Sequence, residues 1–450
     1  MSSVIRPPIA DAKRQPQGAA MTKPLTLGIA GLGTVGAGTV KLLAEHGALI
    51  AERCGRPIRI KAVAARDRKR DRGVDLSPYE WREDPLMLAR DPEIDVVVEL
   101  IGGAGGPAKA LVEAALAAGK HVVTANKALV AHHGMALAEA AERNGVTVAY
   151  EAAVAGGIPI IKLLREGLAA NRIQRITGIL NGTCNYILTT MRQTGREFAD
   201  VLADAQKLGY AEADPSFDVD GIDAAHKLAI LTSVAFGCRI NFKGVHVEGI
   251  RHVSAMDIAF AEELGYRIKL LGIASLTPNG VEQRVHACMV PLEAAIAHVE
   301  GVFNAVVTEG DYVGQTMAEG RGAGAGPTAS AVVADLIDLA RGRLLPAFAL
   351  PVAKLADLPA APMEKHTGAY YVRLMVVDRP GVIADVAAAL RDERVSMEAM
   401  LQRGRAPEEK VPVVLTTHET EEAAMRRVLQ RIADLNTVIE PPRMIRIEAL

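Results

Sequence analysis

The sequence has few cysteines and no excess of either charge. Its four cysteines, Cys54, Cys184, Cys238 and Cys288, lie far apart and form no C-x-x-C pair. This spacing predicts neither a zinc site nor a disulfide framework, and none of the eleven histidines adds a metal-ligand spacing. Lysine and arginine number 51 against 53 aspartates and glutamates, and the net charge of −2 argues against a general nucleic-acid partner.

Long apolar runs are absent as well. Charged residues, glycine or proline interrupt every apolar stretch well before the ~20 residues that a membrane span needs. Residues 1–22 contain arginine, lysine and proline but no signal-peptide core, and we expect them to form a disordered leader. Half of the residues are hydrophobic and 23% are charged, as in a cytoplasmic enzyme, and the length of 450 residues predicts two to four domains.

Four regions follow the leader. Over residues 23–150 strand-like and helix-like segments alternate, which predicts an α/β Rossmann-type domain with helices on both faces of a parallel sheet. The pattern then changes, and we expect residues 151–318 to form an α+β domain for catalysis and dimerisation, with 319–345 rejoining the first domain. Prolines mark residues 346–368 as a linker. Residues 369–450 have the βαββαβ order of a ferredoxin-like module.

The stretch LGIAGLGTVGAGTV places three glycines between a predicted strand and a predicted helix. Gly31 permits a tight turn, Gly33 lets a pyrophosphate approach the backbone, and Gly36 lets helix and strand pack closely. Thr34 and Val35 lie at the helix N-terminus, where free N–H groups suit phosphates. The pattern predicts a dinucleotide site, with a simple tight turn as the alternative.

Residues that follow the other strands should border the same cofactor, because ligands bind at the carboxyl ends of parallel strands. Gly102 and Gly103 follow one such strand, and Thr124 and Lys127 follow the next. Arg66 follows the second strand and could pair with the 2′-phosphate of NADP. The acidic residue directly after it leaves NAD possible.

The stretch GYAEADPSFDVDGIDAAHKLAIL gathers five carboxylates ahead of one lysine. If its second half is helical, Asp223 and Lys227 are four residues apart and lie on one face, in line with an apolar stripe. In a cleft the aspartate would orient the ammonium, and the lysine could exchange a proton with a substrate oxygen. Glu212 and Asp218 in the preceding loop could hold a substrate ammonium, or they could be solvated turn residues.

Six motifs follow one another from Gly31 to Leu336: GLGTVG, TANK, EAAVAGGIPII, LNGTCNYIL, the acidic stretch and GAGAGPTASAVVADL. In this order they resemble the homoserine dehydrogenase family, and the C-terminal module resembles an ACT domain, an amino-acid-sensing unit. The resemblance implies reversible NAD(P)-dependent interconversion of L-homoserine and L-aspartate 4-semialdehyde. This reaction is a step toward threonine, isoleucine and methionine.

The resemblance also implies roles for individual residues of the acidic stretch and of TANK. Lys227 would donate or accept the proton, and Asp223 would hold and tune it. Glu212 and Asp218 would take the amino end of the substrate. Lys127 would lie between nicotinamide and substrate, where an ammonium can neutralise developing alkoxide charge.

Two further sites are implied by the resemblance alone. Gly324 and Gly326 would return to the cofactor near the nicotinamide, although a flexible hinge is a competing interpretation. The family also holds a monovalent cation, usually sodium, and the residues that would supply its oxygen ligands here are Glu151, Val154, Gly156 and Ile158.

Other functions stay open at this level. A non-enzymatic regulator that binds a cofactor and an amino acid would need no lysine–carboxylate pair, and a dehydrogenase of another small semialdehyde or hydroxy acid would share most of these features. The ACT-like tail predicts feedback control by an amino acid, with threonine as the expected effector. The extended middle domain and the pairing tail suggest a homodimer or homotetramer.

Overall fold

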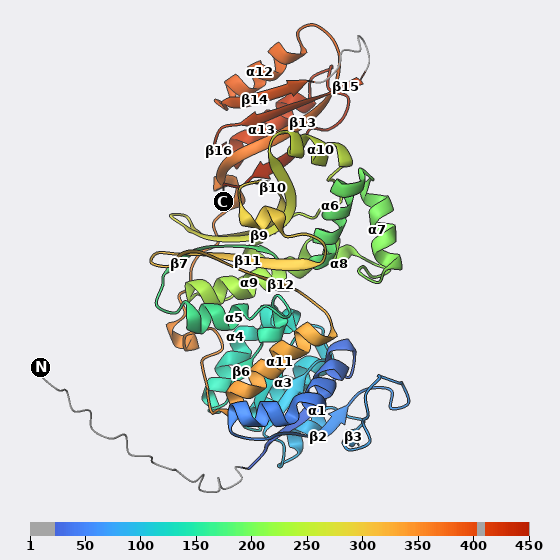
Figure 1. Ribbon diagram of the computed structural model, residues 1–450. Coiled ribbons are helices and arrows are strands. Elements are labelled where there is room, and N and C mark those ends of the chain that lie inside the picture. The colour runs from blue at the N-terminus through green and yellow to red at the C-terminus, as the bar shows by residue number, and fades with distance from the viewer. Residues whose placement is uncertain (1–22, 403–409, 450) are drawn as a thin grey trace, which may run out of the picture.

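The computed structural model describes residues 23–402 and 410–449, so the predicted leader lies outside the described residues. Figure 1 shows an elongated molecule with three stacked parts: a first sheet with its helices, a middle part built on a second sheet, and a C-terminal module. Within the described ranges, no helix combines the length and the apolarity needed to cross a membrane.

The first sheet is wholly parallel and has the order β3-β2-β1-β4-β5-β6. Its central strands are apolar and buried, as helix-covered parallel strands require, which confirms the predicted Rossmann-type fold. The strands are β1 (Leu25–Ala30), β2 (Ile58–Ala64), β3 (Glu80–Arg82), β4 (Val96–Glu99), β5 (His121–Thr124) and β6 (Val148–Ala149). The helices are α1 (Thr34–Cys54), α2 (Leu86–Arg90), α3 (Gly106–Ala117) and α4 (Lys127–Arg143).

A helix from much later in the chain completes this part. α11 (Ala325–Ala340) lies among the helices of the first sheet in Figure 1, and Val332 and Leu336 are fully buried in the same apolar cluster as Leu27 of β1. The strand β12 (Gly314–Arg321) belongs to the second sheet, so the return to the first sheet begins after Arg321.

The second sheet has eleven strands, with the main order β12-β11-β7-β9-β10-β17-β13-β15-β14. Its strands in the middle part are β7 (Ile173–Ile179), β8 (Val245–Val247), β9 (Tyr266–Thr277), β10 (Gly280–Pro291), β11 (Phe303–Gly310) and β12 (Gly314–Arg321). The helices here are α5 (Ile160–Lys162), α6 (Gly182–Thr194), α7 (Phe198–Lys207), α8 (Ser216–Val219), α9 (Ile222–Phe236) and α10 (Ala255–Glu263). α9 covers one face of the sheet, because a Cβ added at Gly272 of β9 would lie 3.5 Å from Leu228 of α9.

The C-terminal module has the predicted βαββαβ order, with one short extra strand. Its elements are β13 (Thr367–Val377), α12 (Val382–Asp392), β14 (Met397–Gln402), β15 (Lys410–Thr417), β16 (Thr420–Glu421), α13 (Glu422–Ala433) and β17 (Arg443–Ile447). The sequence pattern did not predict that this module shares a sheet with the middle part. β17 pairs in parallel with β10 through Cys288 with Arg446 and Met289 with Ile447.

The proline-rich segment before this module runs along the middle part. Val281 donates its backbone N–H to the Pro359 carbonyl at 2.9 Å, and Ala361 donates to the Val281 carbonyl at 2.9 Å. Ala356 and Cys238 form a further isolated bridge. The linker is therefore bonded to the first residues of β10 and to the residues just after α9.

Candidate active site

A cavity of about 600 Å³ lies between the carboxyl ends of the first sheet and the middle part. Residues from many separate segments line it: the segments that follow β1, β5, β6, β7 and β12, the helices α8 and α9, and the loops that contain Tyr210 and Val302. The predicted site residues among its lining are Thr34, Val35, Lys127, Gly156, Asp218, Asp223, Lys227 and Gly324.

Asp223 forms the centre of a lysine–carboxylate cluster in this cavity. Its side chain accepts hydrogen bonds from Lys227 Nζ at 2.7 Å and, on the other oxygen, pairs with Lys127 Nζ at 2.9 Å. Lys227 Nζ also donates to the Leu180 carbonyl at 2.7 Å. Asn181 donates to Asp223 at 2.8 Å. The structure therefore brings together a lysine from α9 and a lysine from α4 on one carboxylate.

The helices explain this placement. α9 begins at Ile222, after Gly221 in a left-handed conformation with φ of 85°, so Asp223 and Lys227 stand one turn apart on it. Lys127 is the first residue of α4, and the side chain of Asn126 caps that helix by accepting the Leu129 N–H at 3.0 Å. Lys127 is thus on a helix N-terminus rather than in a loop.

The electrostatics of the cluster favour charged groups. Burial opposes the charge of Asp223, which is only 3% exposed, but the ammonium groups of Lys227 and Lys127 hold its pKa well below the usual range. Burial likewise opposes the charge of Lys127, yet Asp223 outweighs it and raises the pKa of Lys127. An ionised pair is consequently stable here at neutral pH.

The two acids assigned to the substrate ammonium lie differently. Asp218 of α8 lines the cavity and accepts a hydrogen bond from Asn181 at 2.7 Å, while burial and then the charge of Asp223 raise its pKa. Glu212 is exposed and does not line the cavity, although its charge acts on Lys127. The structure thus places Asp218 with the cluster and Glu212 outside it.

The glycine turn after β1 has the geometry that the sequence predicted. Gly31 has φ of 94°, and a Cβ there would lie 2.4 Å from the Leu100 backbone. A Cβ at Gly36 would lie 2.0 Å from the Gly31 carbonyl, so only glycine allows this contact of helix and strand. A Cβ at Gly33 would meet nothing within 4 Å, which leaves open space above the uncapped N-terminus of α1. These residues fit a bound pyrophosphate.

Glu99 organises the loops that follow β4 and β5. Its buried carboxylate accepts the N–H of Gly102 at 3.0 Å and the hydroxyl of Thr124 at 2.6 Å. The Thr124 side chain is fully buried, so it holds the loop in place through Glu99 and is not available to contact a cofactor. Gly102 and Gly103 are exposed with φ of 87°, outside the cavity lining, and Asn126 holds the Gly103 carbonyl at 2.7 Å. The sequence analysis assigned no role to Glu99, because it is simply the last residue of an apolar strand.

Arg66 is exposed just after β2, and it does not line the cavity. The acidic residue beside it, Asp67, accepts the Lys69 N–H at 2.8 Å through its side chain. A neighbouring arginine, Arg72, donates to the Asp67 carbonyl. Several basic groups therefore surround this turn, and the geometry does not show which of them would contact a 2′-phosphate.

The predicted cation loop has only some of its oxygens available. The Glu151 carboxylate accepts the N–H groups of Ile161 at 2.9 Å and Lys162 at 2.8 Å, so it caps the following helical segment. The Ile158 carbonyl accepts the Ile160 N–H at 2.8 Å. The carbonyl groups of Val154 and Gly156 receive no hydrogen bond from any described residue, and Val154 is fully buried.

Gly156 and the segment before α11 are in close contact. A Cβ at Gly156 would lie 2.4 Å from the Gly322 backbone. Gly324, with φ of 118°, is the N-cap of α11 and lines the cavity, whereas Gly326 lies in the first turn of α11 with open space around it. The glycines therefore let two loops meet at the mouth of the cavity.

Several cavity residues had no role assigned from the sequence. Asn181 bonds both Asp218 and Asp223, and its position as the N-cap of α6 after a strand was the available signal. Tyr210 and Arg321 also line the cavity, but isolated residues at the ends of elements carry no sequence pattern. His226, next to Lys227, is engaged elsewhere, with Nε2 3.1 Å from His132 Nε2.

Outside this cavity, one group of metal-ligand types occurs in the described part of the chain. Ligand atoms of His286, Cys288 and Glu448 lie within 4.8 Å of one another, although the sequence spacing predicted no such group. Arg284 bonds Glu448 at 3.0 Å and contacts His286 Nε2 at 3.0 Å. Because a guanidinium already occupies the position between them, this group does not suit a cation.

A parallel dinucleotide-type sheet and a cavity with a buried lysine–carboxylate cluster define an NAD(P)-dependent oxidoreductase. Comparison with known proteins narrows this class. Residues 159–337 match the family model described as homoserine dehydrogenase, residues 31–151 that of the homoserine dehydrogenase NAD binding domain, and residues 370–436 that of the ACT domain. The chain belongs to the homoserine dehydrogenase family and carries a regulatory ACT domain.

Individual relatives agree over nearly the whole chain. The homoserine dehydrogenase of Neisseria gonorrhoeae is 47% identical over 95% of this chain and 99% of its own. The crystal structure of a homoserine dehydrogenase from Thiobacillus denitrificans is similar with a TM-score of 0.90 and 49% identity, covering 95% of this chain and 98% of that one. A hyperthermophilic archaeal homoserine dehydrogenase in complex with NADPH is similar with a TM-score of 0.60 and 26% identity, covering 70% and 97%.

Proposed function

We propose that this protein interconverts L-homoserine and L-aspartate 4-semialdehyde, with NADP as the preferred cofactor and NAD as the alternative. The observation that carries the proposal is the buried Asp223 carboxylate, which holds two lysine ammonium groups in a cavity beside the glycine turn. The reaction would serve the formation of threonine, isoleucine and methionine, in the cytoplasm.

Lys227 is the group assigned to the proton. An ammonium has three N–H donors. Lys227 donates one to Asp223 and one to the Leu180 carbonyl, so the third remains for the substrate oxygen. When homoserine is oxidised, the hydroxyl proton passes to neutral Lys227; in reduction, protonated Lys227 returns it. A nicotinamide cofactor, when bound beside the glycine turn, would accept or supply the hydride.

Lys127 would stabilise the charge that develops on the same oxygen. Its ammonium lies on the opposite side of Asp223 and 5.6 Å from the centre of the Phe217 ring, and one third of its side chain is exposed to the cavity. A fixed ammonium in a partly desolvated site lowers the energy of a developing alkoxide. Lys127 and Lys227 therefore divide charge stabilisation and proton transfer between them.

Asp218 is the first choice for the substrate ammonium. It is partly buried, lines the cavity and lies next to the cluster through Asn181. Burial and then the charge of Asp223 raise the pKa of Asp218, and a cationic ligand would favour its ionised form. Glu212 is the second candidate, and it would have to move with its loop toward Lys127 to take part.

The cofactor and the cation are proposed from the fit of the residues. Gly31, Gly33 and Gly36 would admit the pyrophosphate, and the solved archaeal relative holds NADPH. For the cation, the unbonded carbonyls of Val154 and Gly156 fit, whereas the occupied Glu151 carboxylate and Ile158 carbonyl would contribute less. Remaining contacts are proposed for Thr34, Val35, Arg66, Gly102, Gly103, Gly324 and Gly326.

The organisation of the chain is proposed on the same basis. Residues 23–150 with the returning segment would bind the cofactor, 151–318 would bind substrate and form a dimer or tetramer, and 369–450 would sense an amino acid such as threonine. The linker over 346–368 would transmit the signal, since it is bonded to the first residues of β10.

The test is reduction of NADP by the purified protein with L-homoserine, repeated with NAD, with and without sodium, and with a panel of other hydroxy acids. We expect turnover with homoserine and a Lys227→Met variant that loses it by about 10²–10⁴-fold while binding NADPH normally. Absence of turnover with both cofactors would refute the proposal, and full activity of Lys227→Met would remove that residue from the chemistry.

A further inference from the structure

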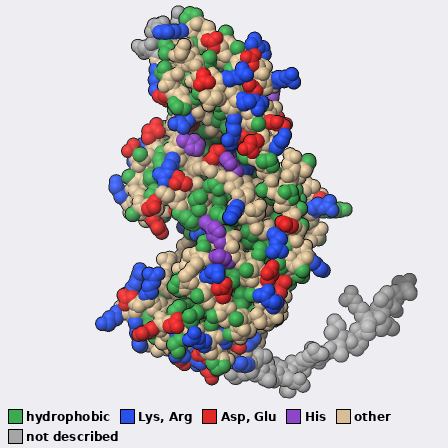
Figure 2. Space-filling view, turned by 180° about the vertical axis from the view of Figure 1, so that it is seen from behind, with side chains coloured by type: hydrophobic (Ala, Val, Ile, Leu, Met, Phe, Trp, Pro, Cys, Tyr) green, Lys and Arg blue, Asp and Glu red, His purple; other side chains and the backbone are tan. Residues whose placement is uncertain are grey.

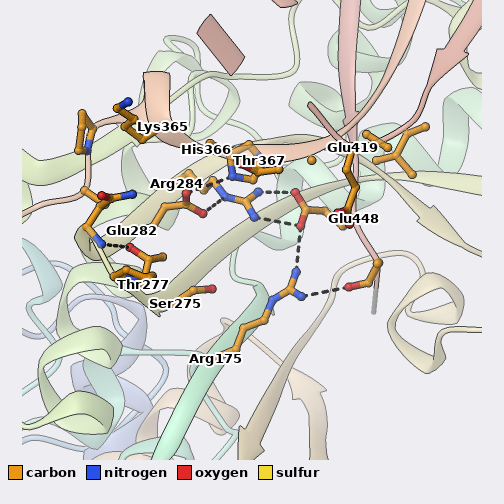
Figure 3. A pocket seen from close by; sticks show the side chains of 18 of the residues that line it. Arg175, Ser275, Thr277, Glu282, Arg284, Lys365, His366, Thr367, Glu419 and Glu448 are labelled. Carbon is orange, nitrogen blue, oxygen red and sulfur yellow. Dashed lines mark hydrogen bonds and ion pairs between the residues drawn. The ribbon is translucent and has the colours of Figure 1, made fainter. Parts of the chain in front are cut away.

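Asn304, at the start of β11, is a buried amide without a hydrogen-bond partner. Its side chain is 1% exposed, and neither Nδ2 nor Oδ1 is bonded to any described residue. Charged groups elsewhere are compensated. In a second cavity, of about 490 Å³, where the ACT module, the linker and the second sheet meet, Arg284 bonds Glu282 at 2.7 Å and Glu448 at 3.0 Å (Figure 3). On the surface, acidic and basic side chains are interspersed over the face shown in Figure 2.

The missing partners destabilise the folded chain. A buried donor or acceptor has lost its water, and almost all such groups in folded proteins are bonded again. An amide has two N–H donors and one acceptor oxygen, so Asn304 leaves both kinds of group unbonded. Leucine has nearly the same shape and no polar atom. The presence of asparagine therefore points to a use for the amide in another state of the protein.

The amide lies between two glycines that line the active-site cavity. A Cβ at Gly322 would lie 2.1 Å from Asn304 Cγ and 2.4 Å from Oδ1, so the amide packs directly on this glycine. A Cβ at Gly182 would lie 3.5 Å from Oδ1, which is an ordinary contact. Both glycines line the cavity, and so does Val302, two residues before Asn304. The amide is therefore directly behind the cavity wall.

The segment that joins β12 to α11 has peptide groups that could pair with this amide. The N–H and carbonyl groups of Gly322 and Ala323 make no hydrogen bond with any described residue. The turn at Gly182 is held more firmly, because Asn181 caps α6 by accepting the Cys184 N–H at 2.8 Å. A small shift of the segment toward β11 would give the amide both a donor and an acceptor.

The same segment faces the proposed cofactor site. A Cβ at Gly38 of α1 would lie 2.7 Å from the Ala325 carbonyl, so the start of α11 contacts the helix that follows the glycine turn. Thr34 and Val35, at the N-terminus of α1, line the same cavity as Gly324. A dinucleotide held at this N-terminus and extending into the cavity would meet the segment.

We propose that Asn304 is a positioning residue for the cofactor. When a nicotinamide cofactor occupies the cavity, the segment moves toward β11, and the amide donates to a carbonyl and accepts an N–H of Gly322 or Ala323. In the free protein the amide is unbonded, so its pairing contributes to the free energy of cofactor binding. The inference rests on the proposed function and adds to it a residue that does not itself line the cavity.

Asn304→Leu separates this role from a purely structural one. Leucine fills the same space without a polar group, so the protein without cofactor should melt ~2 °C higher than wild type. Fluorescence titration should give a Kd for NADPH about tenfold higher, because the bound state can no longer form the bonds. KM for NADP should rise as well, whereas KM for L-homoserine should stay unchanged. A purely structural role would lower stability and affinity together.

Thr177→Val is the matched control. Thr177 of β7 is fully buried in the same sheet, its hydroxyl has no partner among the described residues, and it does not line the cavity. This variant should also melt higher than wild type but should bind NADPH with the wild-type Kd. Asn304→Ala serves if leucine does not fit. It should melt near wild type, since the loss of the unbonded amide offsets the small void, and it should show the same loss of NADPH affinity.

Two results overturn the inference. One is a wild-type Kd for NADPH in both Asn304 variants. The other is a melting temperature clearly below wild type in both, which would show that the amide is already bonded in the free protein, for example by water. A wild-type protein that binds neither NADPH nor NADH refutes the proposed function and this inference with it, whereas normal wild-type binding with unaltered variants refutes the inference alone.

Discussion

Replacing Asp223 by asparagine removes one charge from the centre of the active-site cluster and keeps the shape. The carboxylate bonds Lys227 at 2.7 Å and Lys127 at 2.9 Å and is 3% exposed. Removing one partner of a buried ion pair costs about 3–5 kcal/mol. General acid–base catalysis contributes about 10²–10⁴-fold, or ~3–5 kcal/mol, so stability and turnover should fall by similar free energies.

The pKa shifts predict the direction in which the pH profile of Asp223→Asn should move. Burial opposes the charge of Lys127 and Asp223 is the main group that raises its pKa, so in Asp223→Asn that pKa falls, while the charges of Asp218 and Glu212 still raise it. Activity that needs a charged Lys127 should then decline at lower pH than in wild type. The pKa of Asp223 is depressed, so its contribution to stability is complete at pH 7 and disappears only as the pH falls below ~4.

The assay measures kcat and KM for homoserine across pH, together with urea unfolding at pH 7 and at pH 4. Asp214→Asn is the control, because Asp214 is an exposed acid of the same acidic stretch that bonds Ser216, whose N–H lies at 3.1 Å, and takes no part in the cluster. An Asp223→Asn enzyme with wild-type kcat and an unshifted pH profile would refute the reasoning.

Gly33→Ala should keep the melting temperature and lose NADPH affinity, whereas Gly36→Ala should lower the melting temperature, because its Cβ would overlap the Gly31 carbonyl at 2.0 Å. Thermal unfolding and NADPH fluorescence titration separate the two, and identical behaviour would argue against a pyrophosphate at Gly33. Lys269→Met should stabilise the protein at pH 7, because burial lowers the pKa of Lys269 to about 8 and the Val299 carbonyl keeps a hydrogen bond from Asn185. The gain should shrink as the pH rises from 8 toward 10.5, where wild-type Lys269 is neutral in the folded state, and a gain that grows with pH would contradict this.

The first sheet was predictable because its central strands are apolar and are separated by helices. β3 was not predicted, because a strand of three residues, Glu80–Arg82, is too short to show a periodicity. The βαββαβ order of the C-terminal module was visible for the same reason as the first sheet. Its pairing with β10 was not, since only two residue pairs specify it.

The active site was predictable where chemistry follows local spacing. Asp223 and Lys227 form a pair because the helix places them a turn apart, and local sequence contains that information. The contact of Lys127 with Asp223 joins residues 96 positions apart, so it depends on tertiary packing that no local pattern encodes. Glu212 is near the cluster in sequence but does not line the cavity, so its assignment to the substrate ammonium stays a prediction.

The pairing of β17 with β10 has a consequence for experiments that remove the ACT module. Deleting residues after the linker would leave the side of β10 next to β17 without its neighbour and uncover Arg284, which is 3% exposed in the intact chain. Bare strand edges invite association with other chains. A shortened enzyme would therefore lose solubility as well as regulation, and the two effects could not be told apart. Point variants in the module separate sensing from folding.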